Sequence, residues 1–187
     1  TTAVVGAIGA GFAAVPFISS FKPSARAQTA GAPVTVTIAK LDNEPNMRII
    51  QVWRGKPVWI FKRTPEQLAV LPGLNTRLAD PNSTNVDQTP AFARNTDRTI
   101  KGTETIGVIV GICTHLGCSP TYFPEMVPQP FDPEWQGGFY CPCHQSRFDM
   151  AGRVFKGVPA PSNLEVPPYH YPDDNTIVIG VAPEGAV

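Results

Sequence analysis

Every cysteine of the chain and two of its three histidines fall within two short boxes. The first box is residues 113–118, Cys-Thr-His-Leu-Gly-Cys, and the second is residues 141–146, Cys-Pro-Cys-His-Gln-Ser. Thiolates and imidazoles bind soft and borderline metals, and iron–sulfur clusters are held by such side chains. Gly117, Pro120 and Pro142 bend the chain at the boxes. We therefore predict one iron–sulfur centre pinched between two loops, and a role in electron transfer.

A structural zinc site is the alternative interpretation of these side chains. Zinc needs only four cysteine or histidine ligands, and its paired ligands commonly leave two or more residues between them. Here one residue separates Cys113 from His115, and the second box packs three candidates into four positions. Six candidates at this spacing favour four cluster ligands plus one disulfide over a zinc site.

The composition limits which classes of protein are possible. The 187 residues can bury one sizeable core, and 16 glycines with 21 prolines favour many short strands joined by turns. The 15 basic and 15 acidic side chains balance without any run of five like charges. Nucleic-acid binding is not expected, because no surface of this composition would follow a phosphate backbone.

The N-terminal segment, residues 1–21, carries no charged side chain. As a helix it would span ~30 Å, which matches the hydrocarbon core of a bilayer. We predict a transmembrane anchor, followed by a flexible tether of small and polar residues at 22–32. A signal peptide is the alternative, since residues 25–27, Ala-Arg-Ala, resemble a cleavage site; the apolar run is longer than the usual signal core of ~7 to 15 residues.

The remaining residues, 33–187, are predicted to form one mainly β head that opens as a meander. A helix is expected to begin at residues 64–67 with proline at its first position, and residues 80–99 to be irregular. Each box would follow the end of a strand. The predicted strands cover residues 34–41, 48–52, 58–62, 105–112, 138–140, 153–156, 164–166 and 176–181.

The two boxes resemble those of the Rieske iron–sulfur family. The first box matches the family pattern C-T-H-L-G-C in full, and the second matches C-P-C-H-G-S except at Gln145. The resemblance implies an antiparallel Rieske-type β-sandwich, with an inserted cluster-binding subdomain at residues 111–162. It also implies a [2Fe–2S] cluster. The implied ligands are Cys113 and Cys141 on one iron and His115 and His144 on the other, with a disulfide between Cys118 and Cys143.

The implied disulfide is typical of the high-potential Rieske proteins of cytochrome bc1 and b6f complexes, and it requires an oxidising compartment. Residues 53–57, 111–112, 137–138 and 151–164 are also similar to the bacterial bc1 type. That resemblance implies a subunit of respiratory complex III, a proton-translocating quinol–cytochrome c oxidoreductase. Its partners would be cytochrome b, cytochrome c1 and quinol in a dimeric complex. The helix would cross the bacterial inner membrane once, with the head on the periplasmic side.

The implied chemistry is quinol oxidation, with one electron to the cluster and a proton to His144, before the electron passes to cytochrome c1. Neutral imidazoles leave such a cluster less negative than four thiolates do and raise its potential. Around the ligands, the Ser146 hydroxyl would donate to a sulfur, Leu116 beside Gly117 would dock on cytochrome b, and residues 157–161 would form a lid containing Pro159 and Pro161. A turn serine, a loop-core leucine and an ordinary rigid turn are the structural alternatives.

Several features depart from the family pattern, including a lid one residue longer than the usual Gly-Pro-Ala-Pro. Phe148 stands where bc1 members usually have a tyrosine, Gln145 replaces a glycine, and the segment 119–140 is long. His170 is the only other histidine, so the two-histidine, one-carboxylate iron site of an oxygenase cannot be completed. An independent ferredoxin-like carrier remains the competing interpretation, and it would need neither anchor nor tether.

Overall fold

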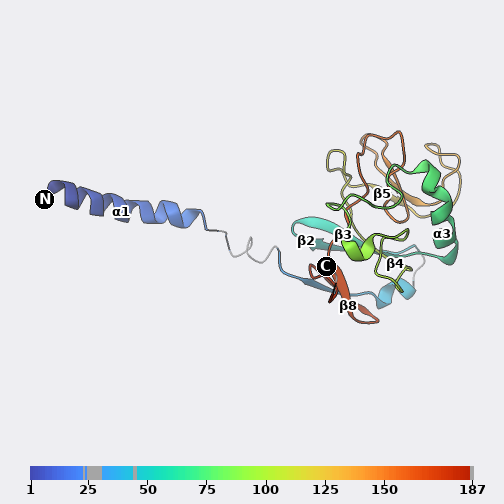
Figure 1. Cartoon of the computed structure of the whole chain (residues 1–187), viewed down its shortest axis with the longest axis horizontal. Coiled ribbons are helices and arrows are strands. Elements are labelled where there is room, and N and C mark those ends of the chain that lie inside the picture. Colours follow the sequence, from blue (N-terminus) through green and yellow to red (C-terminus); the bar gives the residue numbers. More distant parts are fainter. Residues whose placement is uncertain (23, 25–30, 44–45, 186–187) are drawn as a thin grey trace. The chain divides into compact units, whose positions relative to one another are not determined.

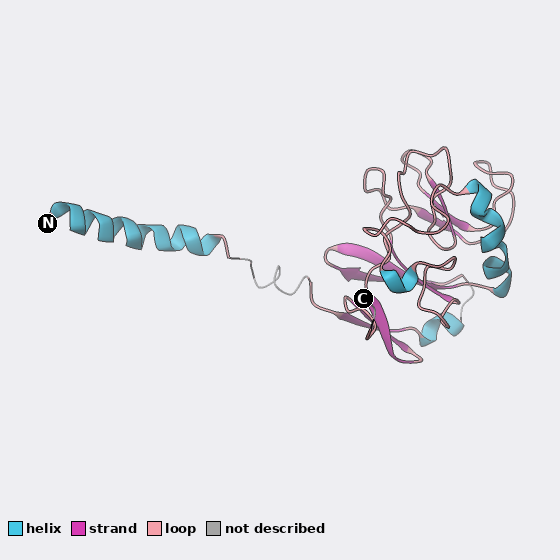
Figure 2. Ribbon diagram, viewed as in Figure 1, coloured by secondary structure: helices cyan, strands magenta, loops and turns pink. Residues whose placement is uncertain are grey.

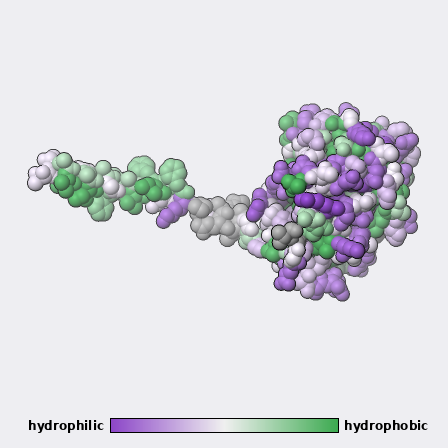
Figure 3. Space-filling model, viewed as in Figure 1, coloured by the Kyte–Doolittle hydropathy of each residue, from purple (hydrophilic) through white to green (hydrophobic). Residues whose placement is uncertain are grey.

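The computed structural model describes residues 1–22, 24, 31–43 and 46–185, which form two separate units, Thr1–Ala32 and Pro33–Val187. The first unit contains helix α1 (Thr2–Ser20), none of whose residues is buried. Figure 3 shows apolar surface along this helix. By length and composition α1 could cross a membrane, a test that signal sequences also pass. The predicted tether lies largely outside the described residues.

The head is built from three antiparallel three-stranded sheets, with the orders β1-β9-β8, β2-β3-β4 and β5-β6-β7 (Figures 1 and 2). The strands are β1 (Val34–Thr37), β2 (Arg48–Trp53), β3 (Lys56–Lys62), β4 (Ile106–Val110), β5 (Thr121–Phe123), β6 (Gly138–Tyr140), β7 (Arg147–Asp149), β8 (Tyr169–Asp173) and β9 (Thr176–Ile179). The helical turns are η1 (Ala39–Asp42), α3 (Pro65–Val70), η2 (Leu71–Arg77) and η3 (Ala91–Ala93). The mainly β prediction is confirmed, and the third sheet is the insertion that carries the second box.

Local sequence explains the hairpin and the helix that were predicted. Arg54 and Gly55 both have positive φ, at 50° and 72°, which suits the tight two-residue turn between β2 and β3. At α3, Thr64 Oγ1 accepts a hydrogen bond from the Gln67 N–H, while the Gln67 side chain accepts one from the Thr64 N–H. This capping box, with Pro65 at the first helical position, starts α3 where the sequence predicted.

Several predicted strands are wrong in detail. The first strand ends at Thr37 and pairs with β9 rather than β2, so the head does not open as a meander. Residues 153–156 make only isolated bridges, because their backbone groups bond to different segments instead of one neighbouring strand. Residues 164–166 form no ladder either; Pro167 and Pro168 follow them directly, and proline lacks the N–H that a ladder requires. Strands β5 and β7 were not predicted, whereas the strand expected around His170 is β8.

An aromatic stack joins the inserted sheet to the sheet beneath it. The Phe139 ring lies 5.3 Å from Trp59, 5.4 Å from Phe61 and 5.3 Å from Tyr122, between ring centroids. Gly107 and Gly111 on and beside β4 allow this packing, since a Cβ there would overlap the Phe61 and Trp59 rings. The stack therefore fixes the platform from which both boxes extend.

Two fully buried arginines hold the segments that follow the second box. Arg153 forms an ion pair with Asp149 at 2.8 Å and donates to the Leu71 carbonyl at 2.7 Å. Arg98 donates to the Leu164 carbonyl at 2.7 Å and the Ala151 carbonyl at 3.0 Å. Buried guanidinium groups that satisfy several carbonyls in this way fix loops that lack a strand ladder.

Candidate metal centre

The two boxes form the same six-residue turn at the ends of β4 and β6. In each, the first residue donates its N–H to the carbonyl of the sixth, and the fifth donates to the carbonyl of the first. These distances are 2.7 and 3.0 Å in the first box and 2.8 and 2.9 Å in the second. The loops are thus matched, and each presents two of the candidate metal-binding side chains.

The fifth residue of each turn has a left-handed backbone. Gly117 has φ of 82°, and Gln145, at the equivalent place in the second box, has φ of 62°. Glycine adopts this region freely, whereas a residue with a Cβ is strained there. The departure at Gln145 therefore leaves the turn unchanged and strains the second loop.

A disulfide between Cys118 and Cys143 joins the loops, with 6.7 Å between the Cα atoms. Cys113 and Cys141 are free and buried. The sulfurs of Cys118, Cys141 and Cys143 lie within 4.8 Å of one another. Because two of these three are consumed by the disulfide, they are not a ligand set; the disulfide instead lies beside the free thiol of Cys141.

The two histidines face each other from opposite loops. Their ring centroids are 4.7 Å apart and their planes are perpendicular. The His115 ring is half-buried and its Nδ1 has no hydrogen-bond partner among the described residues, while His144 is exposed. The two loops together offer two buried free thiols and two imidazoles. These groups fit the donor set of a two-cysteine, two-histidine [2Fe–2S] cluster.

Two hydrogen-bond donors near Cys113 favour the charged thiolate form of its sulfur. Burial raises the pKa of the Cys113 thiol, and hydrogen bonds from the His115 N–H and the Ser146 side chain act in the opposite direction. Hydrogen bonds to a ligand sulfur stabilise its negative charge and tune the metal that it binds. Ser146 thus lies beside the sulfur of one candidate ligand.

The lid at residues 157–161 is bonded to the second box, and Ser162, which follows the lid, is bonded to the first. The Ala160 N–H donates to Ser146 Oγ at 3.0 Å, and Thr114 Oγ1 donates to the Ser162 carbonyl at 2.6 Å. Ala160 is buried beneath, whereas Pro159 and Pro161 are exposed. Sequence reasoning missed Thr114, although a hydroxyl residue inside the first box was a visible signal.

The other predicted neighbours occupy contrasting environments. Leu116 is 71% exposed at the tip of the first loop. Phe148 is fully buried in β7, opposite Phe139. The long segment 119–140 is partly ordered as β5, which pairs with β6, and it places Phe131 in the wall of a cavity beside His144. Sequence reasoning did not connect Phe131 with the site.

Comparison with known proteins places this centre in a family. Residues 78–169 match the model of the Rieske [2Fe-2S] domain, and residues 1–24 match one described as the ubiquinol-cytochrome c reductase Fe-S subunit TAT signal. The ubiquinol-cytochrome c reductase iron-sulfur subunit of Allochromatium vinosum is 54% identical over 179 residues, covering 96% of this chain and 84% of that protein. The chain belongs to the family of ubiquinol-cytochrome c reductase iron–sulfur subunits.

More distant relatives support the same family assignment. The subunit of the same name from Bradyrhizobium diazoefficiens is 37% identical over 180 residues, covering 96% of this chain and 89% of that protein. A solved structure titled "Hyperthermophilic respiratory Complex III" has the same fold, with a TM-score of 0.51 and 21% identity over 94% of this chain and 96% of that chain. The Rieske family assignment excludes the zinc interpretation and gives the protein a Rieske-type [2Fe–2S] cluster.

Proposed function

We propose that this Rieske subunit takes one electron from quinol and passes it to cytochrome c1. The observation that carries the proposal is the pair of facing imidazoles on the loops that also carry two buried free thiols, with one imidazole exposed. The bound cluster supplies a one-electron acceptor and donor. An exposed ligand histidine gives the electron a short path to a partner at the surface.

The proposed ligands are Cys113 and Cys141 for one iron and His115 and His144 for the other. The free, buried state of both thiols supports the first pair, and the unpartnered Nδ1 of His115 supports the second. The disulfide supports the same division, since it removes the other two cysteines from coordination. Ser146 and Gly117 would shape the loops, while Pro159 and Pro161 would form the outer surface of the lid.

His144 is the proposed contact for quinol and the acceptor of its proton. Its exposure allows the contact, and reduction of the bound cluster would raise the proton affinity of the imidazole nitrogen that faces solvent. Electron and proton uptake are then coupled at one side chain. The measured reduction potential should consequently fall as pH becomes alkaline, and a potential constant from neutral to strongly alkaline pH would contradict the coupling.

The proposed setting is a dimeric cytochrome bc1 complex in a bacterial inner membrane. Helix α1 would be the single-pass anchor, residues 22–32 the tether, and residues 33–187 a periplasmic head that meets cytochrome b through Leu116. The disulfide supports an oxidising compartment, and the exposure of Leu116 supports a docking tip. The match of residues 1–24 to a TAT signal supports export of the head and leaves cleavage to be tested.

Electron paramagnetic resonance of the full chain tests the proposal. Mild reduction with ascorbate should produce a rhombic Rieske-type signal, because two neutral ligands give a high potential. His144→Cys is the matched variant, since it keeps a metal-binding group but removes the proton acceptor. A signal that appears only with dithionite would instead identify a low-potential, ferredoxin-like carrier.

A further inference from the structure

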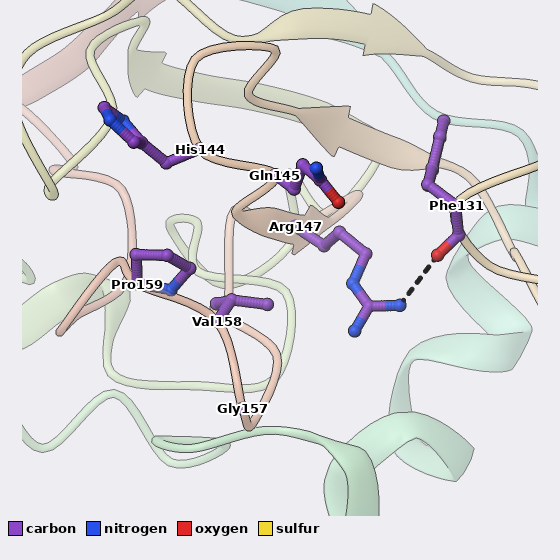
Figure 4. A pocket seen from close by; sticks show the side chains of 7 residues that line it. All are labelled: Phe131, His144, Gln145, Arg147, Gly157, Val158 and Pro159. Carbon is purple, nitrogen blue, oxygen red and sulfur yellow. Dashed lines mark hydrogen bonds between the residues drawn. The ribbon is translucent and has the colours of Figure 1, made fainter.

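A cavity of about 270 Å³ opens beside the exposed ligand histidine (Figure 4). It is distinct from the buried thiols, because neither cysteine contributes to its lining. The walls come from the second box, from β7, from the long segment and from the lid. The lining residues are Phe131, His144, Gln145, Arg147, Gly157, Val158 and Pro159.

The charge of Arg147 in this cavity is only partly neutralised. Its Nη1 lies 3.5 Å from Asp132 Oδ2 and donates to the Phe131 carbonyl at 3.0 Å. The same carboxylate oxygen is 2.6 Å from Arg77 Nη2, so one buried carboxylate is shared by two guanidinium groups. Figure 4 shows the second terminal nitrogen of Arg147 on the side of Val158 and Gly157, away from the bond to Phe131.

Two more polar groups face the same space. The left-handed backbone of Gln145 holds its side-chain amide at the cavity, and His144 forms the adjacent wall (Figure 4). The equivalent position of the first box is Gly117, which offers no side chain there. Gln145 therefore adds a hydrogen-bonding group to the second loop, which lines this cavity.

We propose that this cavity binds a carboxylate on the surface of the protein that receives the electron. A guanidinium with free donors recognises a carboxylate through paired, charge-assisted hydrogen bonds. Quinol carries no negative charge and gains little from such a group, while the apolar tip at Leu116 lies on the other loop. Arg147 would thus dock the acceptor next to His144, and charge complementarity would speed the encounter.

The inference rests on the proposed function, in which one electron passes from the cluster to the acceptor protein. One electron leaves the reduced cluster and reduces the acceptor haem by one electron, while His144 releases to solvent the proton that it took up with that electron. Arg147 takes no part in the redox step; it only shortens the search for a productive orientation. Its removal should therefore change the rate of transfer and its salt dependence, without abolishing the spectroscopic signal of the cluster.

The test uses the assembled reductase carrying Arg147→Gln, Arg147→Lys or, as a matched control, Lys156→Gln. Lys156 is an exposed cation that bonds to the Thr76 carbonyl and does not line the cavity. The measurement is the pre-steady-state reduction of cytochrome c1 by the cluster at several ionic strengths. Loss of a charged hydrogen-bond partner should slow transfer at Arg147→Gln by about tenfold and flatten its salt dependence.

Arg147→Lys should keep the salt dependence but transfer more slowly than wild type, because an ammonium cannot make the paired contact. Lys156→Gln should remain near wild type. Equal rates and equal salt slopes for wild type and Arg147→Gln would overturn the inference, as would slower reduction of the cluster by quinol with unchanged transfer to cytochrome c1. Absence of an ascorbate-reducible signal in the wild type would instead contradict the proposed function.

Discussion

At the scale of single residues, the centre depends on a repeated turn whose fifth position must be left-handed. The first box satisfies this position with Gly117 and the second with Gln145. Both turns keep the same pair of closing hydrogen bonds, so the hydrogen bonds outweigh the strain at Gln145. The second turn thus forms despite a small loss of stability at Gln145.

Gln145→Gly should stabilise the head by about 0.5 to 1 kcal/mol, because relief of the left-handed penalty exceeds the added freedom of the unfolded chain. Denaturant unfolding followed by circular dichroism measures the change. Gly117→Ala is the matched opposite and should destabilise the head. A loss of stability in Gln145→Gly would show that the amide contributes contacts worth more than the strain.

Ser146→Ala should lower the reduction potential. Ser146 contacts the Cys113 sulfur and accepts the Ala160 N–H, so its loss removes a donor that favours the more negative reduced state. Redox titration of the visible or paramagnetic signal measures the potential. Ser146→Thr keeps the hydroxyl and should stay close to wild type; an unchanged potential in Ser146→Ala would limit the serine to holding the lid.

At the scale of elements, the inserted sheet is positioned by aromatic rings and the loops by covalent and hydrogen bonds. The disulfide joins positions that are 25 residues apart in sequence, while Ala160 of the lid and the following Ser162 bond to one loop each. These links replace the strand ladders that the segments 111–120 and 150–168 lack among the described residues. Irregular backbone of this kind needs such links, because few backbone bonds hold it.

The double variant Cys118→Ala with Cys143→Ala should lose about 3 kcal/mol of stability, as expected for a closed loop of this length. Denaturant unfolding measures the loss. A reductant should lower the stability of the wild type and leave the double variant unchanged. If both respond equally to the reductant, the loss would originate at the metal ligands instead.

Tyr122 should make the head less stable at alkaline pH. Burial raises the pKa of Tyr122 to about 12, above its ordinary value of 10, so the folded state favours the neutral phenol. This contribution is fully present below pH 10 and is lost as pH rises toward 12, because the unfolded tyrosine ionises first. Tyr122→Phe should flatten that part of the stability profile; equal slopes in the two proteins would contradict the burial effect.

At the scale of the whole molecule, the chain divides into a helical unit and a head that has its own core. The head, Pro33–Val187, contains the sheets, both boxes and the lid, while α1 is in the other unit. The chemistry should therefore depend on the head alone. The proposed membrane anchor would keep the head near its partners by raising their effective concentration.

Removal of residues 1–32 should release the head from membranes and leave its cluster signal intact. The head keeps every proposed ligand, whereas the deleted segment contains the apolar helix. Membrane fractionation and paramagnetic resonance measure the two properties. Quinol oxidation by the reconstituted complex should fall, with added soluble head restoring it only at high concentration. A truncated head that still sediments with membranes would contradict the anchor role of α1.

The sequence by itself determined the chemistry, because ligand type and spacing are local properties of two six-residue boxes. It also determined α1, the β2–β3 hairpin and the cap of α3, whose signals lie within a few residues. Only the tertiary structure decided that β1 pairs with β9, that the backbone at 160–162 bonds to both boxes, and that Arg147 shares Asp132 with Arg77. These contacts join residues far apart in the chain, and side-chain packing, which no local pattern encodes, selects them.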